Sequence, residues 1–335
     1  MENIATIKSA LAIDAAAEVT RITQSIRELL RTKINRRGLV IGISGGVDSA
    51  VCAALCVIAL GPKKVFGLLM PEQDSSQNST SLGELVAKQL DIDYEIKNIS
   101  STLTAIGCYE WRDKAIKNLF PDYDGSWKNK IIIEGGLEGK INHFKLVVES
   151  PDGELHAAVL PLNEYLTIVA ATNFKQRVRK TTEYFHAERL NYAVIGTPNR
   201  LEYDQGFFVK GGDGLADIKP IAHLYKTQVY ALAKYLGLPD VICNSVPSTD
   251  TYSLQQGQDE FYFALPYQQM DLALWGYNHS VAASLVASEL NIPAEKIVYA
   301  YKDIETKRKT TRYLHMPAQV LAELEVGSHG LVNKN

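Results

Sequence analysis

Apolar residues along this chain alternate between two spacings. From residue 3 to residue 33 they recur at helical spacing, which predicts one or two helices ahead of the first strand. Further along, the pattern predicts buried strands at residues 39–43, 64–70, 94–99 and 192–195, and helices at residues 49–60, 81–90, 164–190 and 226–236. Strands that alternate with helices predict an α/β fold: a doubly wound, mainly parallel sheet with right-handed crossovers and helices on both faces.

This alternation is interrupted between about residues 108 and 161, where the pattern is irregular. Pro151-Asp152-Gly153 stands there between two β-rich runs, and these turn-forming residues predict a β-hairpin. A connection of this length inside a compact domain is usually functional or mobile. We therefore expect one domain over residues 1–335, with segment 108–161 as an insertion that carries the hairpin.

Composition narrows the class of protein. The chain has 335 residues, 46% hydrophobic and 22% charged, which is typical of a folded globular protein. Its net charge of −3 and its scattered Lys and Arg residues argue against a dedicated nucleic-acid binder. No run of about 18 uncharged apolar residues is present, and the N-terminus does not resemble a signal peptide, so we expect no membrane contact and a cytoplasmic location. The four cysteines contain no CxxC pair, which favours buried, reduced thiols.

The strand predicted at residues 39–43 ends in Ser44-Gly45-Gly46-Val47-Asp48-Ser49, directly before a helix. Such a turn gathers backbone N–H groups and the positive end of a helix dipole, which makes it an anion site. The glycines let the backbone approach a ligand, and the serines add hydroxyl donors. Neither the GxGxxG fingerprint nor a Walker A loop fits this turn. We expect it to bind a phosphate chain.

The SGGVDS motif resembles the signature of the ATP pyrophosphatase superfamily, whose members cleave ATP between the α- and β-phosphates. A carboxylate beside a polyphosphate repels it unless a hard cation lies between them, so Asp48 is predicted to hold Mg²⁺. A role for Asp48 as the N-cap of the following helix is compatible with this prediction.

The stretch from residue 171 to residue 250 resembles NAD synthase, and the match runs without a gap from Asn173 to Lys226. Members of that family convert the nicotinate carboxylate of deamido-NAD to the nicotinamide of NAD. The resemblance implies an adenine nucleotide alpha hydrolase-like fold and a homodimer. It places Asp48 and Glu202 on Mg²⁺, and it implies further ATP contacts at Ser44, Gly45, Gly46, Val47, Ser49, Met70, Thr197, Lys210, Lys226 and Ser248.

On the acceptor side, the resemblance implies deamido-NAD contacts at Arg177, Phe207, Asp213 and Asp217. Five of the implied site residues have simpler alternatives. Phe207 and Met70 would also suit a hydrophobic core, Arg177 and Lys226 would suit solvated helix faces, and Asp213 would suit a turn. Near the C-terminus the family usually has a His-Lys pair that reaches a dinucleotide in the other subunit, whereas this chain has Thr306-Lys307-Arg308 and keeps only the lysine.

The implied chemistry follows from charge. A carboxylate does not react with ammonia at neutral pH, so adenylation must first make AMP the leaving group. Mg²⁺, the loop N–H groups, Lys210 and Lys226 would hold the two anions together. Ammonia then displaces AMP, and Asp213 is a candidate acceptor for a proton from ammonium. Longer NAD synthases carry a glutaminase domain for which this chain is too short, and residue 2 is Glu rather than a processed cysteine. We therefore expect free ammonia or a separate glutaminase as the nitrogen source.

Three departures from the family concern the identity of the acceptor rather than ATP binding. They are segment 108–161, the loss of the histidine before Lys307 and the unusual segment after Ser248. The alternative is therefore a paralogous ligase that amidates a different carboxylic acid. A nucleotide-binding module without catalysis would not need Asp48, Glu202, Lys210 and Lys226 together. A tRNA-modifying pyrophosphatase would usually show a basic surface or RNA-binding appendages, and neither is present.

Overall fold

A computed structural model describes residues 7, 9–134, 143–245, 252–254, 257, 262–263 and 265–322. The first half contains α2 (Ala15–Leu29), the π-helical turn η1 (Leu30–Ile34), β1 (Leu39–Gly42), α3 (Val47–Leu60), the 3₁₀ turn η2 (Pro62–Lys64), β2 (Val65–Leu69), α4 (Gln77–Gln89), β3 (Asp93–Ile96), α5 (Ser100–Ala105), α6 (Cys108–Lys117), β4 (Lys128–Glu134), β5 (His143–Glu149) and β6 (Leu155–Val159). The second half contains α7 (Leu162–Leu190), β7 (Ala193–Ile195), α8 (Arg200–Gln205), α9 (Lys226–Tyr235), α10 (Asp240–Cys243), α12 (Tyr267–Asn278), α13 (Ala283–Leu290) and α14 (Ala294–His315).

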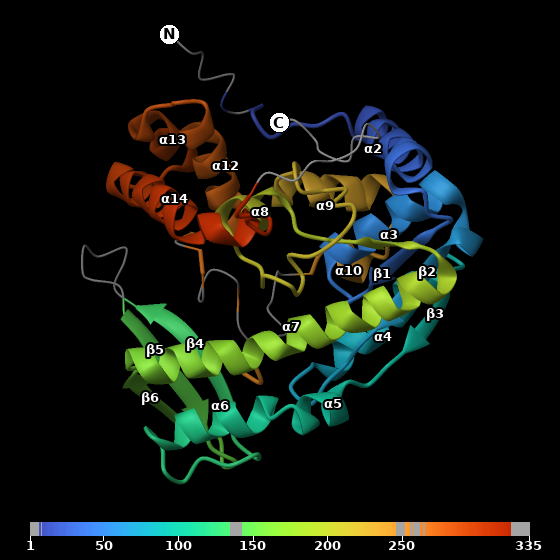
Figure 1. Cartoon of the computed structure of the whole chain (residues 1–335). Helices are drawn as coiled ribbons and strands as arrows, with labels where there is room; N and C mark the ends of the chain where they lie inside the picture. The colour runs from blue at the N-terminus through green and yellow to red at the C-terminus, as the bar shows by residue number, and fades with distance from the viewer. Residues whose placement is uncertain are drawn as a thin grey trace.

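The main sheet is parallel and has the strand order β3-β2-β1-β7, of which β1, β2 and β3 are labelled in Figure 1. Leu39 and Ile41 of β1 point into a core shared with α2, α3 and α9, while Val40 between them points into a core shared with α5, α6 and α7. Both faces of the sheet are therefore covered, and a strand buried on two faces needs the continuous apolar run that the sequence shows. The predicted doubly wound α/β fold is confirmed.

Cysteine placement also agrees with the sequence. Cys52 and Cys56 lie on α3 in the core beneath the main sheet, and Cys108 and Cys243 are buried as well. Burial raises the pKa of the Cys52 and Cys56 thiols well above its usual value, because a thiolate would lose its solvation there. All four side chains are free thiols.

Segment 108–161 forms a second, antiparallel sheet in the order β4-β5-β6. The predicted hairpin is confirmed: the Ser150 N–H donates to Glu154 O at 2.9 Å, and Gly153 takes a positive φ of 86° in the turn. The irregular pattern of this segment predicted no helix, whereas its first ten residues form α6. Buried Arg112 interrupts the apolar spacing of that helix, which hid it from the sequence pattern.

The long helix α7 joins the two sheets (Figure 1). Ile168, near its start, packs into the core of the antiparallel sheet, whereas Val178 and Ala187 pack against the parallel sheet. At about 1.5 Å per residue, its 29 residues extend about 43 Å. A continuous helix of this kind fixes the two sheets relative to each other.

Helices α12, α13 and α14 pack with α8 around a further core near the C-terminus. None of the helices within the described residues is long and apolar enough to cross a membrane. The N-terminal helical prediction is confirmed for α2 and η1, which end at Asn35 in the left-handed conformation. The helix predicted at residues 81–90 begins earlier, at Gln77, because the Ser76 side chain caps it.

Candidate active site

The turn between β1 and α3 is shaped by glycine. Gly45 has a φ of +84°, and a Cβ atom built on it would lie 2.5 Å from the Ser79 carbonyl oxygen. Gly46 is the N-cap of α3, so the N–H groups of its first turn face the loop. The predicted anion-binding geometry at this turn therefore has a backbone that only glycine permits at Gly45.

Two serines hold the same turn in place. The Ser49 hydroxyl donates to Gly46 O at 3.0 Å and accepts the Ser44 N–H at 3.2 Å, while Ser44 Oγ accepts the Gly46 N–H at 3.3 Å. Val47 packs into the core behind the turn. The hydroxyls predicted as ligand donors thus bond to the loop itself and keep its shape.

Asp48 lies in the first turn of α3 and forms an ion pair with buried Lys226 at the start of α9. Asn199 Nδ2 donates to the other carboxylate oxygen of Asp48 at 3.3 Å. Burial alone would lower the pKa of Lys226, but the attraction of Asp48 and Glu202 outweighs it and raises that pKa. The ammonium therefore stays charged. The suggestion that Asp48 is also the N-cap was wrong, because Gly46 occupies that position.

Glu202 is held by a capping box at the start of α8. The Glu202 N–H donates to Asn199 Oδ1 at 3.1 Å, and Glu202 Oε2 accepts the Asn199 N–H at 3.2 Å. Asn199 thus bonds to both acids predicted to bind Mg²⁺. One or two carboxylates, completed by substrate phosphates, are the protein ligands that Mg²⁺ ordinarily uses. Asp48 and Glu202 fit such an ion, with the positive charge of Lys226 already beside them.

A buried carboxylate that the sequence did not single out supports Lys226. Asp271 of α12 is fully buried, and its Oδ2 accepts the N–H of Thr227 at 2.7 Å. Burial raises its pKa from the usual 3.8 to about 6, against the opposing effect of that N–H group. A carboxylate at the N-terminus of α9 fixes the end of the helix that presents Lys226. The sequence signal that could have identified Asp271 is its position as the one charged residue in the run from Met270 to Leu274.

Lys210 bonds to the end of α14 and not to this ion pair. Its ammonium donates to Tyr313 O at 2.8 Å and to Met316 O at 3.1 Å, at the end of α14. Its own carbonyl oxygen accepts a bond from Arg177 Nε at 3.3 Å. In this arrangement Lys210 caps the C-terminus of a helix, and its contact with phosphate stays a prediction.

Asp213 and Asp217 both accept bonds from the backbone. Asp213 Oδ1 accepts the Val209 N–H at 2.7 Å, which is the turn contact expected as its alternative role, and burial raises the pKa of this carboxyl. Asp217 Oδ2 accepts the Val194 N–H of β7 at 2.7 Å, and Tyr184 donates to its other oxygen at 3.3 Å. The predicted acceptor roles of both groups stay untested by these contacts.

Phe207 and Lys307 belong to one aromatic cluster. Phe207 stacks on Tyr262 with ring centroids 4.6 Å apart, and the Lys307 ammonium lies 4.4 Å from the centre of the same Tyr262 ring. Lys307 also pairs with Asp303 at 2.6 Å and donates to Tyr262 O. Burial lowers the pKa of Lys307, while Asp303 opposes this shift. Lys307 thus contacts its own chain, and Phe207 packs against the C-terminal core as its alternative expected.

The remaining predicted residues lie at strand ends. Met70 is buried directly after β2, where its carbonyl oxygen accepts a bond from Arg179 Nε at 3.2 Å, and Thr197 follows β7. Ligands of doubly wound folds bind at this carboxyl edge of the sheet. Ser248 lies outside the described residues. Of the predicted set, the structure brings together the β1–α3 turn, Asp48, Glu202 and Lys226.

Three comparisons bear on this geometry. The sequence model of NAD synthase matches residues 18–120 and 145–313. The chain is 53% identical over 316 residues to the "NH(3)-dependent NAD(+) synthetase" of Rhizobium meliloti (strain 1021), which covers 94% of each chain. The match to the NAD synthase model leaves out residues 121–144, which include β4.

Two solved structures share the fold at low sequence identity. One is the "NH3-dependent NAD synthetase from Campylobacter jejuni", with a TM-score of 0.60 and 22% identity over 92% of this chain and all of that one. The other is the "NMN synthetase from Francisella tularensis", with a TM-score of 0.60 and 20% identity over 92% of this chain and 98% of that one. At this identity both report the fold alone.

Proposed function

The chain belongs to the NAD synthase family and makes NAD from deamido-NAD, ammonia and ATP; we propose that Asp48, Glu202 and Lys226 form the centre at which ATP is cleaved. The observation that carries this proposal is the ion pair of Asp48 with buried Lys226 at the N-terminus of α3. It sets a cation and a carboxylate beside the N–H groups of a glycine turn. Such a site accepts a polyphosphate together with a divalent cation.

In the adenylation step, the nicotinate carboxylate of deamido-NAD attacks the α-phosphorus while pyrophosphate leaves. The loop N–H groups and Lys226 bind the departing phosphates, and Asp48 and Glu202 hold Mg²⁺. Mg²⁺, when bound, supplies positive charge that offsets the repulsion between the two anions. Lys210 joins the phosphate contacts in this proposal, as does Ser248, while Met70 and Thr197 border the adenosine.

In the amidation step, ammonia attacks the carbonyl carbon of the mixed anhydride and AMP departs with its oxygen. We assign Asp213 as the acceptor of the proton that ammonium must lose. Burial raises the pKa of Asp213, and a raised pKa makes a carboxylate a better proton acceptor. Arg177, Phe207, Asp217 and Lys307 are assigned to the deamido-NAD side.

Assembly and supply are further parts of the proposal. A homodimer is supported by exposed apolar side chains in two places: Leu155 and Val159 on β6, and Leu162 and Leu166 in the first turns of α7. Reduced thiols and the use of ATP support a cytoplasmic location. We propose one domain, with segment 108–161 as an addition to it, and free ammonia or a separate glutaminase as the nitrogen source.

The test is an end-point assay with ATP, Mg²⁺, ammonium and deamido-NAD, in which AMP and NAD are followed together by chromatography. Equal amounts of the two products are expected. Omission of ammonium should stop NAD formation, and glutamine should not replace it. If the folded protein binds ATP but forms no NAD, the acceptor assignment is wrong, and a panel of other carboxylic acids with AMP release as the readout would follow.

A further inference from the structure

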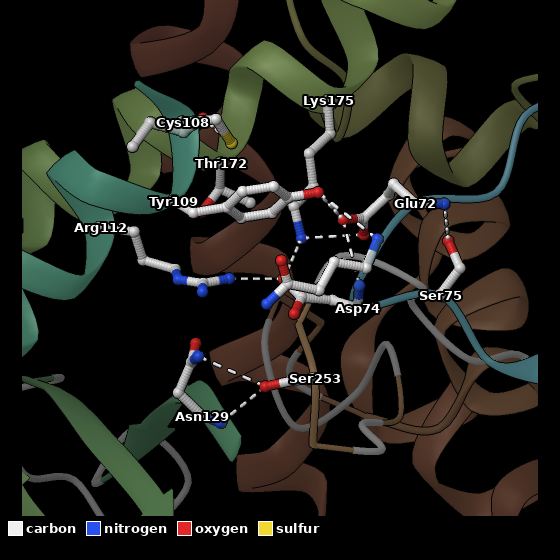
Figure 2. A network of polar contacts seen from close by, with 12 residues as sticks. Glu72, Asp74, Ser75, Cys108, Tyr109, Arg112, Asn129, Thr172, Lys175 and Ser253 are labelled. Carbon is white, nitrogen blue, oxygen red and sulfur yellow. Dashed lines mark hydrogen bonds and ion pairs between the residues drawn. The ribbon is translucent and has the colours of Figure 1, made fainter. Parts of the chain in front are cut away.

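A cluster of buried charged side chains lies at the carboxyl end of β2 (Figure 2). Glu72 and Asp74 follow that strand, Arg112 comes from α6 and Lys175 from α7. Their side chains are 0%, 6%, 4% and 2% exposed, respectively. No motif in the sequence connects these residues, because they come from three separate segments.

The contacts within the cluster balance its charges. Asp74 Oδ2 accepts from Arg112 Nη1 at 2.5 Å and from Lys175 Nζ at 2.6 Å. Lys175 Nζ also lies 3.0 Å from Glu72 Oε1, an ion pair without hydrogen-bond geometry, and the Tyr109 hydroxyl donates to Glu72 Oε2 at 2.7 Å. Burial would raise the pKa of Asp74, but Lys175 and Arg112 outweigh it and lower that pKa. Buried Glu72 and Asp74 thus face two cations, one of which, Arg112, also donates through Nε to the more exposed Asp113 at 2.7 Å.

Such a cluster does little for stability by itself. Removing four charges from water costs free energy that their mutual attraction at best offsets, and apolar replacements of similar volume are often no less stable. Removing one partner, however, leaves an unpaired buried charge. What the cluster does supply is geometry, since each ion pair fixes where the loop from Pro71 to Ser76 lies relative to α6 and α7.

The loop from Pro71 to Ser76 leads into α4, whose first turn lies against the glycine turn between β1 and α3. The Ser75 N–H donates to Glu72 O at 3.0 Å, and the Glu72 N–H donates back to Ser75 Oγ at 3.1 Å. Ser76 then caps α4 by accepting the Ser79 N–H at 3.2 Å. The carbonyl oxygen of Ser79 is the atom that a Cβ on Gly45 would meet at 2.5 Å. The start of α4 is therefore packed against the glycine turn.

We propose that Arg112 and Lys175 are positioning residues for the β1–α3 turn that binds the phosphates of ATP. They hold Asp74 and Glu72 in place, and thereby hold the start of α4 against Gly45. The inference rests on the proposed function and deepens it, because it assigns a role in ATP binding to α6 at the head of segment 108–161. Because the link runs through packing against the turn and not through the acceptor, its loss should act on ATP and spare deamido-NAD.

The test compares Arg112→Gln with Lys114→Gln, a matched loss of an exposed cation on the same helix. For Arg112→Gln we expect the KM for ATP to rise about tenfold, which is about 1.4 kcal/mol, while the KM for deamido-NAD stays within about twofold. Lys114→Gln should leave both constants unchanged. The dissociation constant of ATP, measured calorimetrically without acceptor, should rise as the KM does.

The double variant Asp74→Asn/Arg112→Gln separates positioning from stability. It removes one charge of each sign, so it should recover most of any loss in melting temperature seen in Arg112→Gln. Its KM for ATP should nevertheless stay raised. An unchanged KM for ATP in the folded variants would overturn the proposal, and so would full recovery of that KM in the double variant. If the wild-type chain forms no NAD, the proposed function fails while the calorimetric ATP comparison still decides this inference.

Discussion

The ATP side and the acceptor side of the site are built differently. On the ATP side, backbone groups of the β1–α3 turn and the pair of Asp48 with Lys226 are in place. Lys307 and Asp217, which we propose for the acceptor side, bond to groups of their own chain. Donors carried by a turn are complete once the turn forms, whereas the ammonium of Lys307 would have to leave Asp303 and the Tyr262 carbonyl oxygen before it could bind a substrate. Four experiments test this difference.

Asp48→Asn should have the largest effect. It removes a proposed Mg²⁺ ligand and the counter-charge of buried Lys226, so kcat for NAD formation should fall about 100- to 1000-fold, as for the loss of a group that stabilises developing charge. The chromatographic assay for AMP and NAD measures it, with circular dichroism as the check on folding. Asp93→Asn is the control, because that side chain is 69% exposed. Retention of more than about a tenth of the activity would remove Asp48 from the reaction.

Gly45→Ala tests the shape of the turn. A positive φ and the close Ser79 oxygen both oppose a side chain there, and strain of about 1–3 kcal/mol should raise the KM for ATP about 10- to 100-fold. Gly61→Ala is a matched control, since Gly61 has a φ of +82° but open space around it. The control should lose some thermal stability and keep its KM for ATP. Equal effects of the two changes would show that contact with Ser79 is unimportant.

Lys210→Gln sharpens the boundary between the two sides. If Lys210 leaves the end of α14 to contact phosphate, loss of a charged hydrogen bond of about 1.5 kcal/mol should lower kcat/KM for ATP about tenfold. The control is Lys309→Gln, which removes an exposed cation from α14 itself. A lower melting temperature with unchanged kinetics would instead restrict Lys210 to capping α14.

Asp271→Asn should have the smallest effect, visible in the pH dependence of stability. The folded-state pKa of about 6 lies above the usual 3.8, so the folded chain binds this proton more tightly than the unfolded one. Between those values the free energy of unfolding falls as pH rises, and the loss is complete above pH 6. Urea titrations of both proteins should show that the variant lacks this part of the slope. Parallel profiles from pH 4 to pH 7 would contradict the assignment.

The sequence predicted those parts of the molecule that depend on neighbouring residues. The apolar run of β1, the glycine turn and α3 are contiguous, so one stretch of sequence contains the whole strand-turn-helix unit. The hairpin was equally accessible, because Pro151-Asp152-Gly153 marks its own turn. The family resemblance added Glu202 and Lys226, which lie far along the chain from Asp48.

What the sequence could not predict depends on distant partners. Arg112 looks like a solvated charge until α7 and the loop after β2 close over it. Lys210 and Lys307 match the family motif, yet α14 and the Tyr262 ring decide where their ammonium groups lie. Single residues in a helical pattern carry no information about which remote carbonyl or carboxylate they will meet.

Alkylation of the buried thiols of Cys52 and Cys56 would report how often the structure around this site opens. Both lie on α3, the helix that carries Asp48, and both are shielded from water and held in the unreactive protonated form. An alkylating reagent can therefore reach them only when the core around α3 opens. The rate of alkylation depends on the frequency of those openings. The decrease in this rate on addition of ATP would measure how much the nucleotide stabilises the packing of α3.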